Sequence, residues 1–318
     1  MTLAAGRFLI PSRYEGNLYT AKFIRLFERV ADRLGAELRF CEDVSPGDLP
    51  ADCPFVVALK PVMWCYSEGF RGLLSLPPRI RVFGLWDDIH QGKKGTRYLH
   101  RDRRVLTRFF RRCDAILSTY RSPFLRWYPR YVEKLVHFPF FFAADDFLPV
   151  PFNTAPRAAC ILSGAQNTYY PFRTAAARNP DVVVMPHPGW ASALPAEASR
   201  SFGSAYAREL AKYRCAVTCS SILGYVVAKY MELPAAGCLL LATDAPDLGQ
   251  LGFRDGVNFL RVDESTFDAT LADVLARPEA FEPIRRAGFE LVRARHSDVN
   301  RADALEQLIR ERCAVPTA

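Results

Sequence analysis

The sequence predicts an α/β protein built from two Rossmann-like domains. Short apolar runs alternate with stretches of helical period along most of the 318 residues. This alternation is typical of βαβ units and of parallel sheets. A Pro- and Phe-rich stretch at 138–156 breaks the alternation, which then starts again. We therefore expect one domain at 1–150 and a second at 151–318, with that stretch as the linker. A hydrophobic edge strand is the alternative reading of the stretch.

The expected elements of the first domain follow one another at short intervals. Helical period occurs at 18–34 and near 96–113. The strands are expected in the apolar runs at 7–11, 36–40, 55–59, 80–86, 115–120 and 134–140. Strands separated by helices in this way pair in parallel.

The second domain repeats the pattern and ends in helices. Its strands are expected at 158–164, 181–187, 215–221, 238–242 and 257–262. The helices are expected to begin near Pro171 and to cover 204–213, 226–234, 266–276, 279–295 and 298–313. Two Rossmann-like domains in tandem are the simplest account of this order.

Composition narrows the class of protein. Half of the residues are apolar and 24% are charged, as in globular proteins. No apolar run approaches the roughly 20 residues that span a bilayer, and the apolar run near the N-terminus is too short for a signal peptide. The nine Cys include no CxxC pair, so we expect reduced structural cysteines and no zinc. We expect a cytoplasmic protein.

The positive charge is concentrated in one segment. Residues 1–150 hold 24 basic and 16 acidic residues, whereas 151–318 hold 18 of each. Residues 93–112 alone hold nine basic residues and one Asp, so this segment equals the net charge of +8 of the whole chain. Such a concentration indicates an anionic partner or surface.

The basic segment has the pattern of an amphipathic helix. One face carries arginines at 97, 101, 104, 108 and 111, and the opposite face carries apolar residues expected to pack on the sheet. A solvated face is the ordinary reading, but like charges at this spacing repel one another. We therefore expect Arg97, Arg101, Arg104 and Arg108 to contact an acceptor or an anionic membrane. No recognised nucleic-acid-binding module is present.

Polar residues at strand ends form the candidate binding site, because open α/β sheets bind ligands at the carboxyl ends of their strands. Ser163 and Gly164 end the strand at 158–164, and a Gly there permits a close backbone approach to a ligand. Arg173 falls in the first turn of the next helix, where a cation is unfavourable unless an anion binds nearby. We interpret Arg173 as an anion ligand; an ordinary surface arginine is the alternative.

Two further positions lie near the same edge. His187 ends the strand at 181–187 between two prolines, so it is either a ligand contact or a structural residue of the turn. Lys229 and Glu232 are three residues apart on a helix and share a face. An intrahelical ion pair there contributes only about 0.2–0.5 kcal/mol. Lys suits a diphosphate and Glu suits ribose hydroxyls, so the pair is also suited to a nucleotide.

Residues 158–313 resemble the donor-binding domain of GT-B-fold glycosyltransferases, in the group of CgeB-like and glycosyl transferases group 1 proteins. The matching stretches are ILSGAQNTYYPFR, VVAKYMELPAAGCLLLATDAPDLGQLGFRDGVNFLRV and RRAGFELVRARHSDVNRADAL. The resemblance implies the GT-B fold, with two Rossmann-like domains that face a central cleft. It also implies a nucleotide sugar bound by the C-terminal domain, and final helices packed across both domains. The N-terminal half matches only in general pattern, as expected of an acceptor-binding domain.

The resemblance assigns roles to individual residues. In this family a Glu before a small-small-Gly step contacts the donor ribose, and Glu232 holds that position. Basic residues contact the diphosphate, so Lys229 and Arg173 are the candidates. The loop TDAPDLGQLGF corresponds to one that lines the donor, which adds Asp244 and Asp247, and Tyr225 precedes the helix in the same region. Many retaining members carry two Glu in an E-x7-E spacing, whereas this chain has Gly224 at the first position. The sequence therefore leaves retention and inversion both open.

The candidate catalytic residues are in the N-terminal half. In GLWDDIHQGKKG, Asp88 and His90 follow a strand, so they are expected at the carboxyl edge of the first sheet. Glycosyl transfer needs a group that takes the proton from the acceptor hydroxyl, and a carboxylate or imidazole can do this. An N-cap of the following helix is the alternative role.

We therefore expect a metal-independent, hexosyltransferase-type glycosyltransferase that acts on a glycan, lipid-linked or other cell-envelope acceptor. It would use a nucleotide sugar as co-substrate, need no cofactor, and lie in the cytoplasm or peripherally at the inner face of the membrane. One alternative is a polyol-phosphate transferase on the same fold. Another is a non-catalytic member that binds a nucleotide sugar or a partner protein. A nicotinamide-dependent oxidoreductase is disfavoured, because neither half opens with GxGxxG after its first strand.

Overall fold

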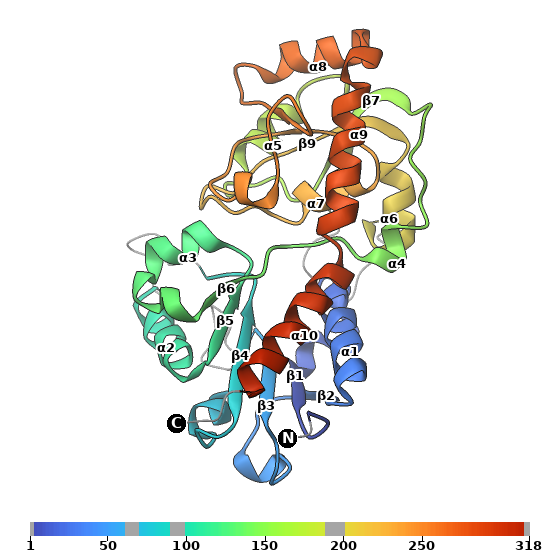
Figure 1. The fold of residues 1–318 in the computed structure, drawn as a ribbon. Helices are drawn as coiled ribbons and strands as arrows, with labels where there is room; N and C mark the ends of the chain where they lie inside the picture. Colours follow the sequence, from blue (N-terminus) through green and yellow to red (C-terminus); the bar gives the residue numbers. More distant parts are fainter. Residues whose placement is uncertain (1–2, 61–69, 90–98, 188–200, 315–318) are drawn as a thin grey trace. The chain divides into compact units, whose positions relative to one another are not determined.

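The structure is a computed structural model that describes residues 3–60, 70–89, 99–187 and 201–314, with the side chains of 99–103 and 105 left aside. The chain forms two compact units (Figure 1). Unit 1 comprises Met1–Pro139 and Val299–Ala318, and unit 2 comprises Phe140–Asp298. Each unit has one parallel sheet, so the expected α/β class with two Rossmann-like domains is confirmed.

Unit 1 contains a six-stranded parallel sheet in the order β2-β1-β3-β4-β5-β6. Its strands are β1 (Arg7–Pro11), β2 (Glu37–Cys41), β3 (Phe55–Leu59), β4 (Arg81–Trp86), β5 (Ala115–Ser118) and β6 (Leu135–His137). Its helices are α1 (Ala21–Leu34), α2 (Leu99–Arg112), α3 (Arg121–Trp127) and α10 (Asp298–Ala314), with short 3₁₀ turns η1 (Ser12–Tyr14), η2 (Pro46–Asp48), η3 (Arg71–Ser75) and η4 (Pro129–Lys134).

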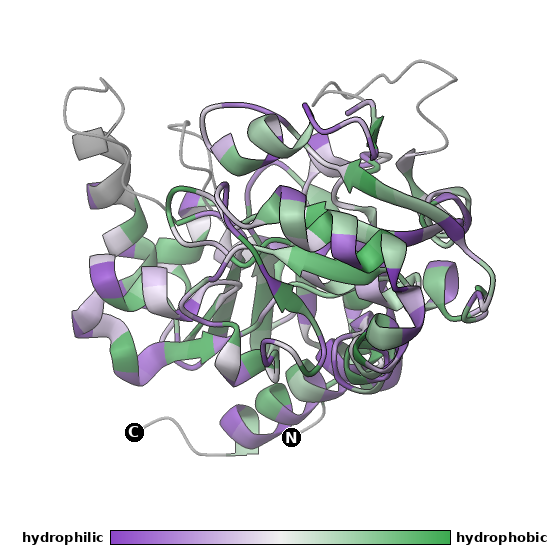
Figure 2. Cartoon of the chain, turned by 90° about the horizontal axis from the view of Figure 1, so that it is seen from above, coloured by the Kyte–Doolittle hydropathy of each residue, from purple (hydrophilic) through white to green (hydrophobic). Residues whose placement is uncertain are grey.

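Aromatic rings fill the core of unit 1. Phe8 on β1 contacts Phe27 of α1 and Phe55 of β3 edge to face, at centroid distances of 5.3 and 5.9 Å. Phe110 of α2 packs on Trp86 at the end of β4, at 5.0 Å. These rings are fully buried, and the strands are the most hydrophobic segments in Figure 2, whereas the helices carry both colours. The apolar faces expected for α1 and α2 are therefore the ones that the sheet covers.

Unit 2 contains a five-stranded parallel sheet in the order β11-β10-β9-β7-β8. Its strands are β7 (Arg157–Ser163), β8 (Val182–Met185), β9 (Tyr213–Thr218), β10 (Leu239–Ala242) and β11 (Leu260–Arg261). Its helices are α4 (Ala144–Phe147), α5 (Pro171–Ala176), α6 (Gly203–Leu210), α7 (Lys229–Ala235), α8 (Phe267–Ala276) and α9 (Pro278–Arg295), with the 3₁₀ turn η6 (Gly249–Leu251). Buried residues of β7, β9 and β10 pack with α5 and α8 in one core, which includes Phe172 and Phe267 in an edge-to-face contact.

The units divide the chain at other places than the expected 1–150 and 151–318. Much of the expected linker is part of unit 2, because Arg293 of α9 donates hydrogen bonds to the carbonyl oxygens of Phe147, Leu148 and Val150. Apart from its first residue, Asp298, the last helix belongs to unit 1. There α10 lies beside α1 (Figure 1), and Asp303 forms an ion pair with Arg33 at 2.7 Å.

Two elements of unit 2 are shorter than expected. The strand expected at 257–262 reduces to β11, because the side chain of Asn258 bonds the backbone of Arg254 and Gly252 and so closes a loop. The helix expected from Val226 begins only at Lys229, after a turn in which the Gly224 N–H bonds the Ser221 carbonyl at 2.8 Å.

Both sheets have a point where the strand order reverses. In unit 1 the chain adds β2 on one side of β1 and β3 on the other, and in unit 2 it adds β8 and β9 on opposite sides of β7. Ligands of open α/β sheets bind at the carboxyl ends of the strands beside such a reversal. None of the described helices is both long enough and apolar enough to cross a membrane.

Candidate functional site

Four side chains form a continuous polar chain at the carboxyl edge of the unit 2 sheet. Ser163 ends β7, Tyr206 lies on α6, and Lys229 and Glu232 lie in the first turn of α7. The Lys229 Nζ is 2.7 Å from Glu232 Oε2 and 2.6 Å from the Tyr206 hydroxyl. The Tyr206 hydroxyl is in turn 2.9 Å from Ser163 Oγ. The structure thus brings together three of the expected donor-binding residues and one, Tyr206, that the sequence did not indicate.

Lys229 is a fixed cation in this chain. Burial disfavours its charged form, but the Glu232 carboxylate and the Tyr206 hydroxyl outweigh that effect and raise the pKa of Lys229 well above its ordinary value. The ammonium also lies 4.4 Å from the centroid of the Tyr206 ring. The intrahelical ion pair that the spacing allowed is therefore present, and it holds a protonated lysine at the edge of the sheet.

Tyr206 sets the direction of the hydrogen bonds. Burial raises the pKa of its hydroxyl, so the side chain is a neutral phenol. Because the Lys229 ammonium can only donate, the Tyr206 oxygen accepts that bond and its own O–H is available to Ser163 Oγ. Ser163 Oγ in turn donates a long hydrogen bond of 3.9 Å to Met185 Sδ. In the sequence, a Tyr in an amphipathic helix is typical of a core residue. Only the contact with Lys229 in the structure shows that Tyr206 is part of the candidate site.

Arg173 bridges the reversal point of the sheet. It is 3% exposed, and its guanidinium donates to Thr218 Oγ1, at the end of β9, and to the carbonyl of Ala165, after β7. The guanidinium also stacks on the Tyr170 ring at 4.1 Å. Gly164 has φ +118°, and a Cβ there would lie 2.8 Å from Nη1 of Arg173, so only Gly fits. Arg173 is thus a buried cation of the turn and not a surface residue.

His187 follows β8 and is close to both cations. Burial lowers the pKa of its imidazole from the ordinary 6.5, and the charges of Lys229 and Arg173 lower it further. The ring is therefore neutral at pH 7. Ser163, Gly164, Arg173, His187, Lys229 and Glu232 thus gather around the carboxyl ends of β7, β8 and β9.

The remaining donor-binding candidates lie near the ends of β9 and β10. Tyr225 and Asp247 are buried, whereas Asp244 is exposed and bonds the N–H of Ala245 at 2.8 Å. The loops after β9 and β10 are tied together, because the Ser220 N–H donates to Thr243 Oγ1 at 2.9 Å.

Gly224, where many retaining relatives carry a Glu, has a backbone that disfavours any side chain. Its φ is +80°, in the left-handed region that residues with a side chain rarely adopt, whereas the space itself is open enough, since a Cβ there would lie at an ordinary contact distance of 3.5 Å from Pro246. The position at which the E-x7-E spacing has its first Glu is therefore a loop position whose backbone favours glycine.

Asp88, one of the two catalytic candidates, lies at the carboxyl edge of the unit 1 sheet, as expected. Asp87 and Asp88 follow β4, and residues 90–98 before α2 lie outside the described part of the chain, so the N-cap role remains the alternative. Lys60, at the end of β3, pairs with Asp87 at 2.6 Å, a contact that the sequence did not indicate. His90 lies outside the described residues.

The basic face of α2 is exposed where it is described. Arg104, Arg108 and Arg111 are exposed, and Leu106, Phe109 and Phe110 are buried, as the periodicity predicted. Arg97 and the side chain of Arg101 lie outside the described part of the chain. Within that part, no carboxylate forms an ion pair with these three arginines.

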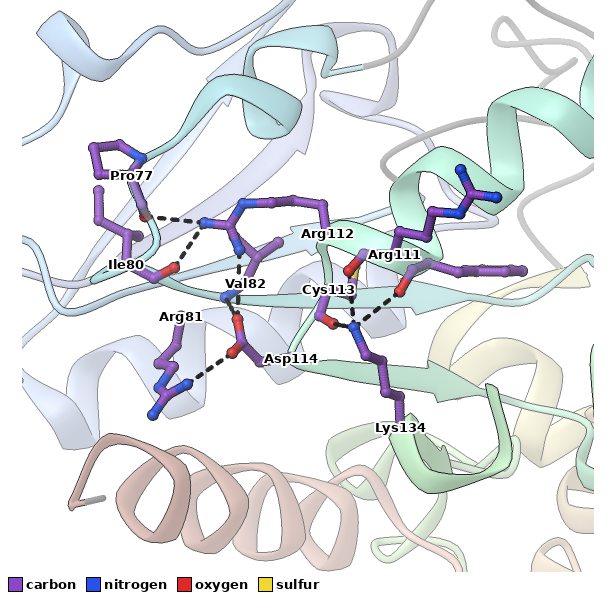
Figure 3. A network of polar contacts seen from close by, with 10 residues as sticks. Pro77, Ile80, Arg81, Val82, Arg111, Arg112, Cys113, Asp114 and Lys134 are labelled. Carbon is purple, nitrogen blue, oxygen red and sulfur yellow. Dashed lines mark hydrogen bonds and ion pairs between the residues drawn. The ribbon is translucent and has the colours of Figure 1, made fainter. Parts of the chain in front are cut away.

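The end of α2 is anchored so that the arginines stay on the surface. Figure 3 shows Lys134 bonded to the carbonyls of Arg111 and Cys113, at 2.8 and 2.7 Å, and Arg112 bonded to Ile80 and near Asp114. The Arg111 guanidinium points away from this network (Figure 3). Arg108, Arg111 and Arg112 line an open depression of about 350 Å³ together with Leu74.

Comparison with known families gives one match. Residues 165–307 match the model of the family described as glycosyl transferase-like. This stretch contains Arg173, His187, Lys229, Glu232 and the loop of Asp244 and Asp247. The resemblance to glycosyltransferases is confirmed, although the match does not separate CgeB-like members from others. A search of curated protein sequences finds no match.

Solved structures with a similar fold are GT-B glycosyltransferases. Sucrose-phosphate synthase from Thermosynechococcus elongatus is 14% identical, with a TM-score of 0.62 over 97% of this chain and 99% of the other. Anabaena HepE in complex with UDP-glucose is 11% identical, with a TM-score of 0.59 over 97% and 99%.

A third similar structure is the pneumococcal O-GlcNAc transferase GtfA in complex with UDP and GlcNAc. It is 12% identical, with a TM-score of 0.53 over 81% of this chain. The present chain spans only 56% of the length of GtfA. The expected GT-B fold is confirmed by these similarities.

Proposed function

Since residues 165–307 form a glycosyl transferase-like domain in a chain with the GT-B fold, we propose that this protein transfers a sugar from a nucleotide-sugar donor to an acceptor hydroxyl. The observation that carries the proposal is the protonated Lys229 held by Glu232 and Tyr206 beside the Ser163–Gly164 turn. A fixed cation at the carboxyl edge of the sheet stabilises the negative charge that grows on a leaving diphosphate.

We propose UDP as the nucleotide of the donor. Two similar proteins were solved with UDP ligands, HepE with UDP-glucose and GtfA with UDP and GlcNAc. In this chain the diphosphate would contact Lys229, Arg173 and the backbone at Ser163–Gly164, and Glu232 would accept hydrogen bonds from the ribose. Tyr225, Asp244 and Asp247 would border the donor on the β10 side, and His187 would approach the diphosphate.

In the transfer step the acceptor oxygen forms a bond to the anomeric carbon while the bond from that carbon to the diphosphate oxygen breaks. The electron pair of the broken bond goes to the diphosphate, and the acceptor proton goes to a base, for which we propose Asp88, with His90 as the neighbouring candidate. Lys229 and Arg173 supply two positive charges for the leaving group. We therefore propose a hexosyl transfer that requires no metal ion or other cofactor.

We propose that the acceptor is a glycan, lipid-linked or other cell-envelope molecule and that it is bound by unit 1. The support is the row of exposed arginines on α2, which have no acidic partner in the described part of the chain. Arg104, Arg108 and Arg111 would hold the protein peripherally on an anionic lipid surface at the inner face of the membrane.

One observation favours a second candidate, a non-catalytic member that binds a nucleotide sugar. The left-handed backbone of Gly224 disfavours a Glu at this position, where the resemblance implies one in many retaining members. A polyol-phosphate transferase, which has an anionic acceptor, would also use the arginines of α2.

The first experiment is a thermal-shift screen with UDP, GDP, ADP, CMP and dTDP and with a sugar-linked form of each. A ligand that binds only the folded state stabilises it by about 2.7 kcal/mol at 100 times its dissociation constant, which gives a visible shift. We expect UDP and a UDP-sugar to raise the melting temperature, and the Lys229→Met variant to lose that rise. A wild-type protein that responds to none of the ten ligands would refute the proposal.

A further inference from the structure

A lysine, a carboxylate and an aromatic ring meet at the carboxyl edge of the unit 1 sheet. Lys60 follows β3, Asp87 follows β4, and Tyr14 ends the turn directly after β1. The Lys60 Nζ lies 2.6 Å from Asp87 Oδ2 and 5.2 Å from the centroid of the Tyr14 ring. Strands β1, β3 and β4 are neighbours, and the strand order reverses between β1 and β3. The cluster therefore occupies the place where an open α/β sheet binds its ligand.

The backbone of Lys60 is in an unusual conformation. Its φ is +45°, and no other non-glycine residue in the described part of the chain has a positive φ. An L-residue adopts this conformation at a cost in energy, and such residues gather at binding and active sites. The conformation is held by a hydrogen bond from the Lys60 N–H to the Leu85 carbonyl at 2.8 Å. The sequence, which has a lysine after an apolar strand, gives no sign of this.

The pair is accessible and incompletely satisfied. The side chains of Lys60 and Asp87 are 17% and 20% exposed. Within the described residues, the second carboxylate oxygen of Asp87 has no hydrogen-bond partner. Burial opposes the charged form of Lys60, but Asp87, Tyr14 and Asp88 together outweigh burial, so the pKa of Lys60 is raised. Lys60 therefore remains protonated at neutral pH.

The chemistry of the pair fits a hydroxyl better than an anion. A sugar hydroxyl both donates and accepts, and a carboxylate beside an ammonium offers one acceptor and one donor at adjacent positions. A phosphate in the same place would meet the carboxylates of Asp87 and Asp88 and be repelled.

We propose that Lys60 and Asp87 form an acceptor subsite that binds the hydroxyls of a neutral sugar, with Lys60 as the residue that positions the carboxylate. This inference rests on the proposed function, because it identifies the class of acceptor. The ion pair at 2.6 Å holds the Asp87 carboxylate in place, so we assign Asp87 to binding the acceptor and keep Asp88 as the proposed base.

The test uses the full chain with UDP present. The probes are the methyl glycosides of glucose, galactose, mannose and N-acetylglucosamine, and the matching sugar 1-phosphates, followed by saturation-transfer difference NMR and titration. The variants are Asp87→Asn, Lys60→Asn and Lys60→Arg. Asn is chosen at position 60 because it tolerates a positive φ, so this variant is expected to fold. Glu28→Gln is the matched control, since it removes one exposed negative charge of unit 1 away from the cluster.

We expect the wild-type protein and Glu28→Gln to bind at least one methyl glycoside more tightly than its 1-phosphate. Asp87→Asn and Lys60→Asn should weaken that binding by roughly tenfold, as the loss of a charge-assisted hydrogen bond does. Lys60→Arg should weaken it less than Lys60→Asn, because the positive charge remains. In turnover assays the acceptor KM should rise in the same two variants while the KM of the UDP-sugar stays the same.

Several results would overturn the inference: equal glycoside binding by Asp87→Asn and wild type, a preference for the 1-phosphates, or no glycoside binding by a wild-type protein that binds UDP. UDP affinity, measured for every variant by calorimetry, separates these failures from a failure of the proposed function. A wild-type protein that does not bind UDP refutes UDP as the donor nucleotide, and glycoside binding lost in the two variants would still support the subsite.

Discussion

The ammonium of Lys229 and the phenol of Tyr206 make two contacts at once, a 2.6 Å hydrogen bond to the hydroxyl and a cation–π contact at 4.4 Å from the ring centroid. With Glu232 on the other side, the lysine is held from two directions. Its position is therefore fixed before any ligand arrives. An ordered cation loses little conformational entropy on binding a diphosphate, which favours both binding and stabilisation of the leaving group.

Replacing Tyr206 by Phe separates the two contacts, because the ring remains and the hydroxyl is lost. We expect UDP to bind about 3- to 10-fold more weakly, since both Lys229 and Ser163 lose a hydrogen bond. The free energy of unfolding should fall by only about 1 kcal/mol. Calorimetric titration with UDP and chemical denaturation provide the two values. Unchanged UDP affinity in a folded variant would show that the Tyr206 hydroxyl does not support the donor site.

Glu232 is tested best by a comparison of two ligands. We expect the wild-type protein to prefer UDP over 2′-deoxy-UDP by roughly tenfold, because the carboxylate would accept a hydrogen bond from the ribose 2′-hydroxyl. The Glu232→Ala variant should bind both ligands equally. The ratio of affinities is the useful quantity, since loss of the ion pair with Lys229 affects both ligands alike. If the variant keeps the wild-type preference, Glu232 serves only to hold Lys229.

His187 reports on the charge of the site. Its pKa is lowered from 6.5 by burial and by the two neighbouring cations, and a bound diphosphate would offset those cations. We therefore expect UDP to raise the pKa of His187, as followed by NMR of the ring protons. His187→Gln identifies its signal among the five His of the chain. A titration that UDP leaves unchanged would place the diphosphate elsewhere.

The same shift has a consequence for stability in the free protein. Because the folded-state pKa of His187 is lower than that of the unfolded chain, the unfolded state binds a proton more readily below pH 6.5. The contribution of His187 to the free energy of unfolding is thus present above pH 6.5, and it is lost as the pH falls through the folded-state pKa. The His187→Gln variant should show a weaker dependence of melting temperature on pH in this window.

The local sequence pattern predicted the strands and helices of the fold, but it predicted the candidate site only in part. The strand at 55–59 was predicted at its observed bounds because five consecutive apolar residues are typical of a strand buried on both faces. The boundary of the units was not predictable from local pattern. It depends on distant contacts, such as those of Arg293 with Phe147 and Val150 and of Arg33 with Asp303.

In the candidate site, too, some residues could be predicted from the local sequence and others depend on distant contacts. Lys229 and Glu232 could be found because both lie in one apolar helix, and Ser163 and Gly164 because they end a strand. Tyr206 and Lys60 could not, because each acquires its role from a partner 23 or more residues away. For Lys60 the unusual backbone appears only in three dimensions.

The arginines of α2 give a prediction about membranes. Changing Arg104, Arg108 and Arg111 together to Gln should weaken binding to vesicles that contain phosphatidylserine by roughly 100-fold, because each basic residue near an anionic surface contributes about 1 kcal/mol. The control is a second triple variant with the same change in charge in unit 2, Arg178, Arg208 and Arg254 to Gln, all exposed. Co-sedimentation at several salt concentrations measures the binding. Equal loss in both variants would mean that net charge, and not the face of α2, attracts the protein.

Asp88 and Asp87 are adjacent in sequence, but replacing each of them by Asn should change the kinetics in a different way. The carboxylate of Asp87 is held by its ion pair with Lys60 at 2.6 Å, and we propose Asp88 as the base. If Asp88 takes the acceptor proton, Asp88→Asn should lower kcat by about 10²- to 10⁴-fold, as the loss of a general base does, and should leave the affinity for UDP unchanged. Asp87→Asn should instead raise the acceptor KM with a smaller effect on kcat.

The pH profile separates the two roles further, because the acidic limb of kcat should disappear in Asp88→Asn and persist in Asp87→Asn. If Asp88→Asn keeps wild-type turnover with that limb intact, the base is another group, and Asp88 contributes only negative charge beside Lys60.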